Sequence, residues 1–151
     1  MDSEECLPRM EREELLRRYD AGERVFTVDL SGIDLSGVDF STKDGKRKRI
    51  DFSCCNLSGV NFRGANLSDG MLMDADLTGT DLSEAILIST NFEGALLINA
   101  ILINSNINGS GFVEADLTRA NFTGAKGGFG GKSTIFNQTI MPDGSILSEI
   151  L

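Results

Sequence analysis

Histidine and tryptophan are absent from the sequence, and cysteine and proline are scarce. The 151 residues include three cysteines and two prolines. Without histidine, imidazole acid–base catalysis and histidine-ligated metal sites are excluded. The cysteines, Cys6, Cys54 and Cys55, are odd in number and two of them are adjacent. That arrangement does not fit a disulfide framework and favours a reducing compartment. We therefore expect a cytoplasmic protein.

Long apolar runs and an excess of positive charge are also missing. No apolar run approaches the 18 or so residues that a membrane-spanning helix needs. The charged N-terminus lacks the apolar region of a signal peptide. Lysine and arginine number 14 against 23 aspartates and glutamates, so the net charge is −9. We expect no direct binding to nucleic acid through a basic face. A basic partner, or imitation of a polyanion, is compatible with this charge.

A five-residue period dominates the chain from Phe52 onward. Every fifth position from 52 to 122 is Leu, Phe or Ile, which gives fifteen apolar positions, and the residue two before each is mostly small. Leu30, Leu35 and Phe40 repeat the pattern and bring the number of repeats to 18. A period of five fits neither a helix nor a continuous strand. It fits short extended pieces joined by turns, with the apolar residue pointing inward.

Four such units would close a square coil, and successive coils would stack at strand spacing, about 4.8 Å. Residues 20 apart then share a face, and each coil buries its apolar side against its neighbours. The predicted core columns of the four faces are Phe52, Leu72, Phe92 and Phe112 (face 1); Leu57, Leu77, Leu97 and Leu117 (face 2); Phe62, Leu82, Leu102 and Phe122 (face 3); and Leu67, Leu87 and Ile107 (face 4).

The segments "ADLTGTDLSEA", "GVNFRGANLSDG" and "ADLTRANFTGA" resemble the A(D/N)LXX motif of the pentapeptide-repeat family, and the resemblance covers residues 28 to 125. It implies an all-β solenoid, the right-handed quadrilateral β-helix. The charged "ELLRRYDAGER" before the repeats and the closing "TIMPDGS" resemble cyanobacterial members in particular. The family pattern also implies that the Asp or Asn of each repeat hydrogen-bonds nearby backbone.

Three segments follow from this pattern. A short helix is predicted over 9–21, with Pro8 near its start, Gly22 at its stop, and Leu15, Leu16 and Tyr19 covering the first coil. Residues 1–24 are predicted to form a charged N-terminal segment with a capping helix. Residues 25–125 are predicted to form a β-helix with a basic loop insertion at 41–50, and residues 126–151 an irregular C-terminal cap.

The first candidate site is an outward apolar cluster, here called the mid-rod patch: Ile86, Ile88, Leu96, Ile98, Ile101 and Ile103. These residues flank Leu87, Leu97 and Leu102, where the repeat expects polar neighbours. The sequence places Leu96 and Ile98 on one face, Ile101 and Ile103 on the next, and Ile86 and Ile88 one face earlier in the path. Exposed apolar patches usually mark interaction sites. Alternatively, the C-terminal tail "SILSEIL" covers the patch, or it has no role because β-branched residues favour strands.

The second candidate site is the basic loop, which holds five of the 14 basic residues: Lys43, Lys46, Arg47, Lys48 and Arg49. It is either a solvated loop or a contact for an acidic partner or a phosphate.

Catalytic, cofactor-binding and metal-binding residues are not predicted. No nucleophile has a basic partner, and "KGGFGGKST" has Lys126 where a phosphate-binding loop needs glycine.

The predicted function is a non-catalytic scaffold that binds an unidentified protein, or a second copy of itself. The alternative comes from the family resemblance, which includes acidic rods that resemble duplex DNA and bind DNA gyrase. Residues 50–125 contain nine acidic and two basic side chains, so an acidic DNA mimic acting on a topoisomerase is the second hypothesis.

Overall fold

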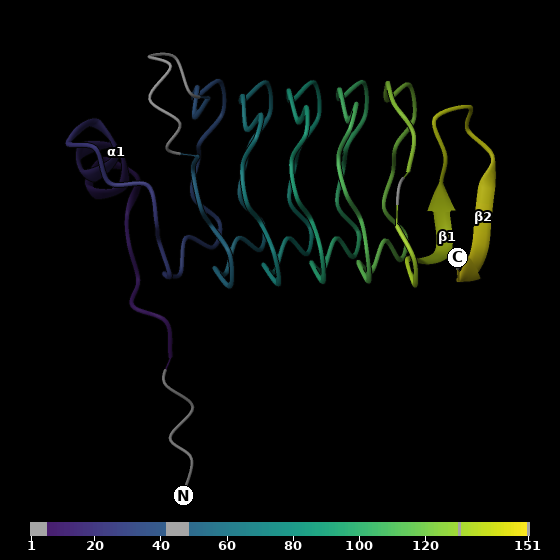
Figure 1. Cartoon of the computed structure of the whole chain (residues 1–151), viewed down its shortest axis with the longest axis horizontal. Coiled ribbons are helices and arrows are strands. Elements are labelled where there is room, and N and C mark those ends of the chain that lie inside the picture. The colour runs from purple at the N-terminus through teal and green to yellow at the C-terminus, as the bar shows by residue number, and fades with distance from the viewer. Residues whose placement is uncertain (1–5, 42–48, 130, 151) are drawn as a thin grey trace, which may run out of the picture.

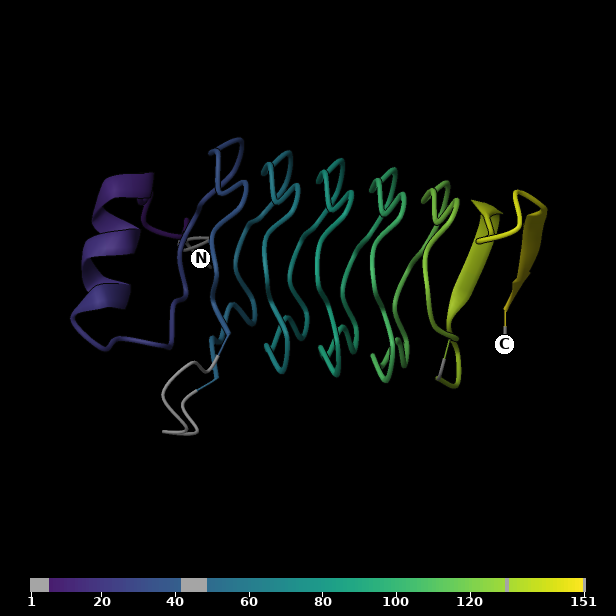
Figure 2. The ribbon, with the colours of Figure 1, turned by 90° about the horizontal axis from the view of Figure 1, so that it is seen from above.

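The fold is a stack of coils along one long axis (Figure 1). A computed structural model describes residues 6–41, 49–129 and 131–150. Helix α1 (Arg12–Asp20) lies at the N-terminal end of the stack, and strands β1 (Ile135–Ile140) and β2 (Ile146–Ile150) lie at the other end. The view from above shows the same order (Figure 2). Between these elements the chain alternates short extended steps with turns, and neighbouring coils are joined by parallel bridges.

Each coil takes four repeats, as the sequence predicts. Asp76 bridges to Leu96 and Leu96 bridges to Asp116, each pair 20 residues apart in the sequence. The bonds between coils are regular: Leu77 N–H donates to the Leu96 carbonyl at 2.7 Å, and Leu97 N–H donates to the Asp116 carbonyl at 2.8 Å. These ladders bond most of the backbone that faces another coil, which the burial of that backbone requires.

The core consists of columns of like side chains along the axis. All fifteen apolar positions predicted from 52 to 122 are buried. The rings of Phe92 and Phe112 lie in register, with centroids 5.1 Å apart and planes at 3°. Phe26, which is 2% exposed, begins the column of face 1. The five-residue spacing does not include it, because Phe26 lies four positions before Leu30 and not five.

A corner after each central residue turns the chain from one face to the next. The second residue after the central one has positive φ, as in Gly79 (67°) and Asp74 (55°). The turn closes with a bond such as that from Ala75 N–H to the Leu72 carbonyl at 3.2 Å. Positive φ at the third turn residue is the type II pattern, which glycine and asparagine favour. The frequent glycine of the repeat therefore has a conformational cause.

Helix α1 packs against the first coil. Leu15 is buried, and the ring of Tyr19 meets the ring of Phe40 edge-on, with centroids 5.1 Å apart. The helix is shorter than the predicted 9–21 because the chain before it is extended. Arg9 bridges to Asp29, and Met10 N–H donates to the Asp29 carbonyl at 2.9 Å.

The C-terminal segment forms a two-stranded antiparallel sheet where the sequence predicts an irregular cap. β1 continues the coil ladder through Asp116↔Ile135 and Asn121↔Ile140, and β2 pairs with β1. The sequence does not show the alternation typical of a strand here, because a register shift between Phe136 and Thr139 interrupts the alternation of buried and exposed residues in β1. The described part of the "SILSEIL" tail thus pairs with β1, beyond the coil that contains Asp116. Cover of the mid-rod patch by this tail is therefore wrong.

We expect Phe92→Ala to lower the free energy of unfolding by about 3–5 kcal/mol, because it leaves a cavity in the column between two coils. The neighbouring substitution Glu93→Ala, at an exposed position, should change it by no more than about 0.5 kcal/mol. Urea unfolding followed by circular dichroism measures both. Equal effects of the two variants would contradict the assignment of Phe92 to the core.

Candidate interaction surface

The mid-rod patch spans three faces of the rod. Leu96 bridges Asp76 and Asp116 on face 2, and Ile101 bridges Asp81 and Asn121 on face 3. Leu96 and Ile101 are 41% and 38% exposed, and Ile98 and Ile103 are half-buried. These four residues follow one another around a single corner of one coil. We call Leu96, Ile98, Ile101 and Ile103 the mid-rod ledge.

Ile86 and Ile88 lie across the rod from Leu96 and Ile98, on the face that follows the face of Ile101 and Ile103. Ile86 bridges Asn66 and Asn106, so it belongs to face 4. Face 4 comes two steps before the face of Leu96, on the opposite side of the square coil. The sequence-based placement one face earlier was therefore wrong, because Asn91 and its neighbours occupy the intervening face. Both residues are exposed, at 39% and 40%, but they share no surface with Leu96.

The ledge residues occupy positions that usually accept a hydrogen bond. In most repeats the Asp or Asn before the central residue accepts a bond from the backbone two residues later. Asp76 Oδ1 accepts from Thr78 N–H at 3.0 Å, and Asp116 Oδ1 accepts from Thr118 N–H at 2.9 Å. This confirms the structural role that the family pattern implied for these residues. Leu96 and Ile101 have no oxygen with which to make the bond. The coil therefore gives up two turn bonds, each worth about 0.5–1.5 kcal/mol, where it exposes apolar side chains.

Acidic side chains border the ledge. Asp76 and Asp116 lie on either side of Leu96, and Asp74 and Glu114 lie at the corner that leads into face 2. Among the described residues, none of these four carboxylates forms an ion pair. The surface is therefore an apolar strip with a negative rim.

Two cations lie near the same surface, and each has a partner. Arg63 forms an ion pair with Glu84, and Arg119 Nε donates to Asn99 Oδ1 at 3.1 Å. Arg63 therefore cancels the charge of Glu84, which is not among the four rim carboxylates. Arg119 offsets one of the four, and the surroundings of the ledge stay negative.

The predicted basic loop falls largely outside the described residues, since Lys43, Lys46, Arg47 and Lys48 lie in the segment 42–48. Arg49 is described and exposed. Contact of this loop with an acidic partner or a phosphate stays a prediction.

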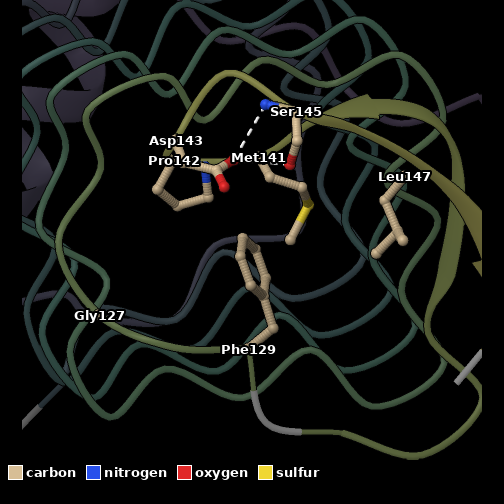
Figure 3. A pocket seen from close by; sticks show the side chains of 7 residues that line it. All are labelled: Gly127, Phe129, Met141, Pro142, Asp143, Ser145 and Leu147. Carbon is tan, nitrogen blue, oxygen red and sulfur yellow. Dashed lines mark hydrogen bonds between the residues drawn. The ribbon is translucent and has the colours of Figure 1, made fainter.

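A pocket of about 490 Å³ opens at the C-terminal end (Figure 3). Figure 3 shows Phe129 pointing toward Met141, with Leu147 to one side. The polar side chains of the pocket, Asp143 and Ser145, bond to each other within one turn. Asp143 Oδ1 accepts from Ser145 N–H at 2.9 Å and from the Ser145 hydroxyl at 2.6 Å. These bonds hold the pKa of Asp143 below its usual range. The pocket thus offers apolar contacts and no paired acid and base.

In the part of the chain that the structure describes, no group of three or more His, Cys, Asp or Glu side chains could hold a metal ion. In the same residues, no helix has the length and apolar character needed to cross a membrane. The segment at Lys132 and Ser133 leads into strand β1, whereas a phosphate-binding loop leads into a helix.

The adjacent cysteines have different surroundings. Cys55 is buried at an inward small-residue position, and its thiol donates to the Phe26 carbonyl at 3.0 Å. Burial raises the pKa of Cys55 to about 11. Cys54 is exposed at a corner with φ of 61°. Cys54 is thus the accessible thiol of the pair, as its outward position in the repeat predicts.

The coil geometry defines a quadrilateral β-helix, and comparison with known proteins agrees. The pentapeptide repeat family matches residues 48–69, 75–112 and 102–126, in eight copies. A pentapeptide repeat protein (Rfr23) from the cyanobacterium Cyanothece 51142 is 30% identical, with a TM-score of 0.59, over 75% of this chain and 90% of that one. This chain belongs to the pentapeptide repeat family, whose members fold as right-handed quadrilateral β-helices and are generally non-catalytic.

Two further solved structures are similar over shorter parts of their length. A pentapeptide repeat protein from the Arabidopsis thaliana thylakoid lumen is 38% identical, with a TM-score of 0.51, over 63% of this chain and 65% of that one. QnrB1, a plasmid-mediated fluoroquinolone resistance protein, is 21% identical with a TM-score of 0.52, over 77% and 59%. At that identity the likeness shows the fold alone. No curated protein matches the chain.

We expect Leu96→Asn to raise the free energy of unfolding by about 0.5–1.5 kcal/mol, because the new amide oxygen can accept from Ile98 N–H as its counterparts do in other repeats. Asp76→Ala, which removes such an acceptor, should lower it by a similar amount. Urea unfolding at neutral pH measures both. A destabilised Leu96→Asn variant would show that Leu96 contributes to the packing of the isolated rod.

The raised pKa of Cys55 links stability to pH. Its contribution is complete below the unfolded thiol pKa of about 8.5 and is lost as the pH rises toward the folded value. Between about pH 8 and about pH 10, we expect the native chain to lose more stability than Cys55→Ala, which places at 55 the residue most common at this position. Urea unfolding at the two pH values gives the difference. Equal losses would contradict the linkage.

Proposed function

We propose that this chain is a non-catalytic scaffold that binds another protein through the mid-rod ledge. The observation that carries the proposal is the replacement of turn acceptors by Leu96 and Ile101. The rod gives up two hydrogen bonds and exposes apolar area where the repeat offers a polar solution. A protein partner that covers the ledge would recover the cost, since burying apolar area gains about 25 cal/mol per Å².

Helix α1 and the C-terminal hairpin have a different role in this proposal. We infer that α1 caps one end of the solenoid and that Phe129 with β1 closes the other. The ring of Phe129 contacts those of Phe112, Phe122 and Phe136, with centroids 5.6, 4.7 and 5.5 Å apart. Covered ends protect the unpaired edges of a solenoid. The faces then remain as the surfaces available to a partner.

The test compares three forms of the chain by affinity capture from a lysate of the source cells, with quantitative mass spectrometry. The forms are the native chain, the ledge variant Leu96→Asn with Ile101→Asn, and the control Ile86→Asn. All three new side chains restore a turn acceptor, but Ile86 lies outside the ledge, on face 4 across the rod from Leu96. We expect one or more proteins to be captured by the native chain and the control and to be lost by about tenfold or more from the ledge variant, the loss that about 1.4 kcal/mol produces.

Light scattering after size exclusion separates a foreign partner from self-association. A native dimer that becomes a folded monomer in the ledge variant would make a second copy the occupant. A captured protein that the ledge variant retains would contradict the proposal.

The second candidate function is an acidic DNA mimic that binds a topoisomerase. It is supported by the nine acidic and two basic side chains of residues 50–125. A partner recognised through this charge would leave the rod at high salt, because screening weakens exposed charge pairs. It would be captured by the ledge variant as well as by the native chain. The same capture experiment, repeated with duplex DNA as competitor, therefore distinguishes the two functions.

A further inference from the structure

We propose that the segment bound at the mid-rod ledge is a basic amphipathic helix that lies along the rod axis, with leucine-like side chains on the ledge and lysine or arginine side chains on its acidic rim. This inference rests on the proposed scaffold function and names the chemistry of the partner.

Face 2 carries an ordered row of side chains along the rod axis. Successive coils place Asp76, Leu96 and Asp116 in one row, joined by direct bridges between neighbours. Face 3 places Asp81, Ile101 and Asn121 in a parallel row. Each row therefore has a polar or acidic residue, then an apolar residue, then another polar or acidic residue. A partner that matches these rows needs a cation, an apolar side chain and a second cation in sequence.

The spacing of side chains along each row matches the rise of an α-helix. Neighbouring coils lie about 4.8 Å apart, so the two carboxylates that flank Leu96 are separated by about 9.6 Å along the axis. An α-helix rises 1.5 Å per residue, so about three residues span one coil and about six or seven span two. Residues i, i+3 and i+7 lie on one face of a helix. A helix with Lys, Leu and Lys at these positions would place each side chain on its counterpart.

The rim carboxylates have oxygens that can still accept hydrogen bonds from a partner. Oδ1 of Asp76 and Oδ1 of Asp116 accept turn bonds, and each carboxylate keeps a second oxygen that can receive an ammonium or guanidinium group. Asp74 and Glu114 add two exposed carboxylates at the corner. The nearby cation Arg119, which donates to Asn99, offsets one of these four carboxylates, so the rim keeps a net negative charge.

Ile86 and Ile88, across the rod from Leu96, have different neighbours from the ledge residues. Ile86 and Ile88 are as exposed as Leu96, but Ile86 is flanked by Asn66 and Asn106 and has no acidic rim on its own face. The ledge therefore differs from this second apolar pair in charge rather than in exposure. The chain thus contains its own control for the part that charge plays.

The test uses fluorescein-labelled helical peptides of about 18 residues, long enough to form helix in an alanine-rich sequence. The first peptide carries Lys, Leu and Lys at i, i+3 and i+7 along one face. The second has Glu in place of Lys, and the third has Ser in place of Leu. Fluorescence anisotropy gives the Kd of each peptide for the native chain, at low and at physiological ionic strength.

Four forms of the protein complete the design. They are the native chain, Leu96→Asn with Ile101→Asn, Asp76→Asn with Asp116→Asn, and Ile86→Asn. The Asp→Asn changes remove charge and keep the turn acceptor, so the fold is preserved. We expect the Lys–Leu peptide to bind the native chain and Ile86→Asn equally, and about tenfold more tightly than it binds either double variant. The Asp→Asn variant should also show the weaker salt dependence, because it has fewer charges to screen.

Three results would overturn the inference. Equal binding of the Ser peptide, unchanged by the ledge substitutions, would assign recognition to charge alone. Tighter binding of the Glu peptide would show that the rim does not select a basic partner. No measurable binding of the Lys–Leu peptide would exclude this class of helix. In each case the capture experiment decides the scaffold proposal separately, since it depends on the ledge substitutions and not on the peptide.

Discussion

The structure depends on a corner every five residues. The second residue after each central Leu, Phe or Ile takes positive φ, and the short step that follows must donate to and accept from the neighbouring coil. Gly79 satisfies this corner without strain, and Asp74 and Asn99 adopt it with side chains. Because the corners recur at a fixed interval, the central side chain always points inward. The columns of Leu and Phe, the narrow interior and the long straight faces follow from that one repeated turn.

The repeat could be predicted from the sequence because its information is local and redundant. The fifteen central residues report the same environment, so the buried columns and the four-unit coil were correct. Phe26 was missed because one short interval places it out of phase. The C-terminal hairpin was missed because β1 has an irregular register between Phe136 and Thr139. Both failures occur where the chain leaves the period and depends on single contacts.

The sequence names the residues of the candidate site, and the structure changes how they are grouped on the faces. Ile86 and Leu96 look alike in the sequence, and only counting around the square coil separates them. The acidic residues on either side of Leu96 follow from the 20-residue spacing of the columns, since Asp76 and Asp116 are 40 residues apart and lie one coil before and one coil after it. What the sequence did contain was the anomaly itself, an apolar residue in the place of an Asp or Asn. In a regular repeat, such a departure marks the positions where the side chain is not explained by the turn.

The turn acceptors have a consequence for how such a rod can vary. Asp and Asn supply the same acceptor oxygen, as Asp76 and Asn66 do on opposite faces. The backbone therefore fixes the shape of these positions and leaves their charge open. One chain of this architecture can carry a strongly negative surface and another a neutral one on the same coil geometry. The surface charge of each face can therefore change from one chain to another without a change in the backbone geometry.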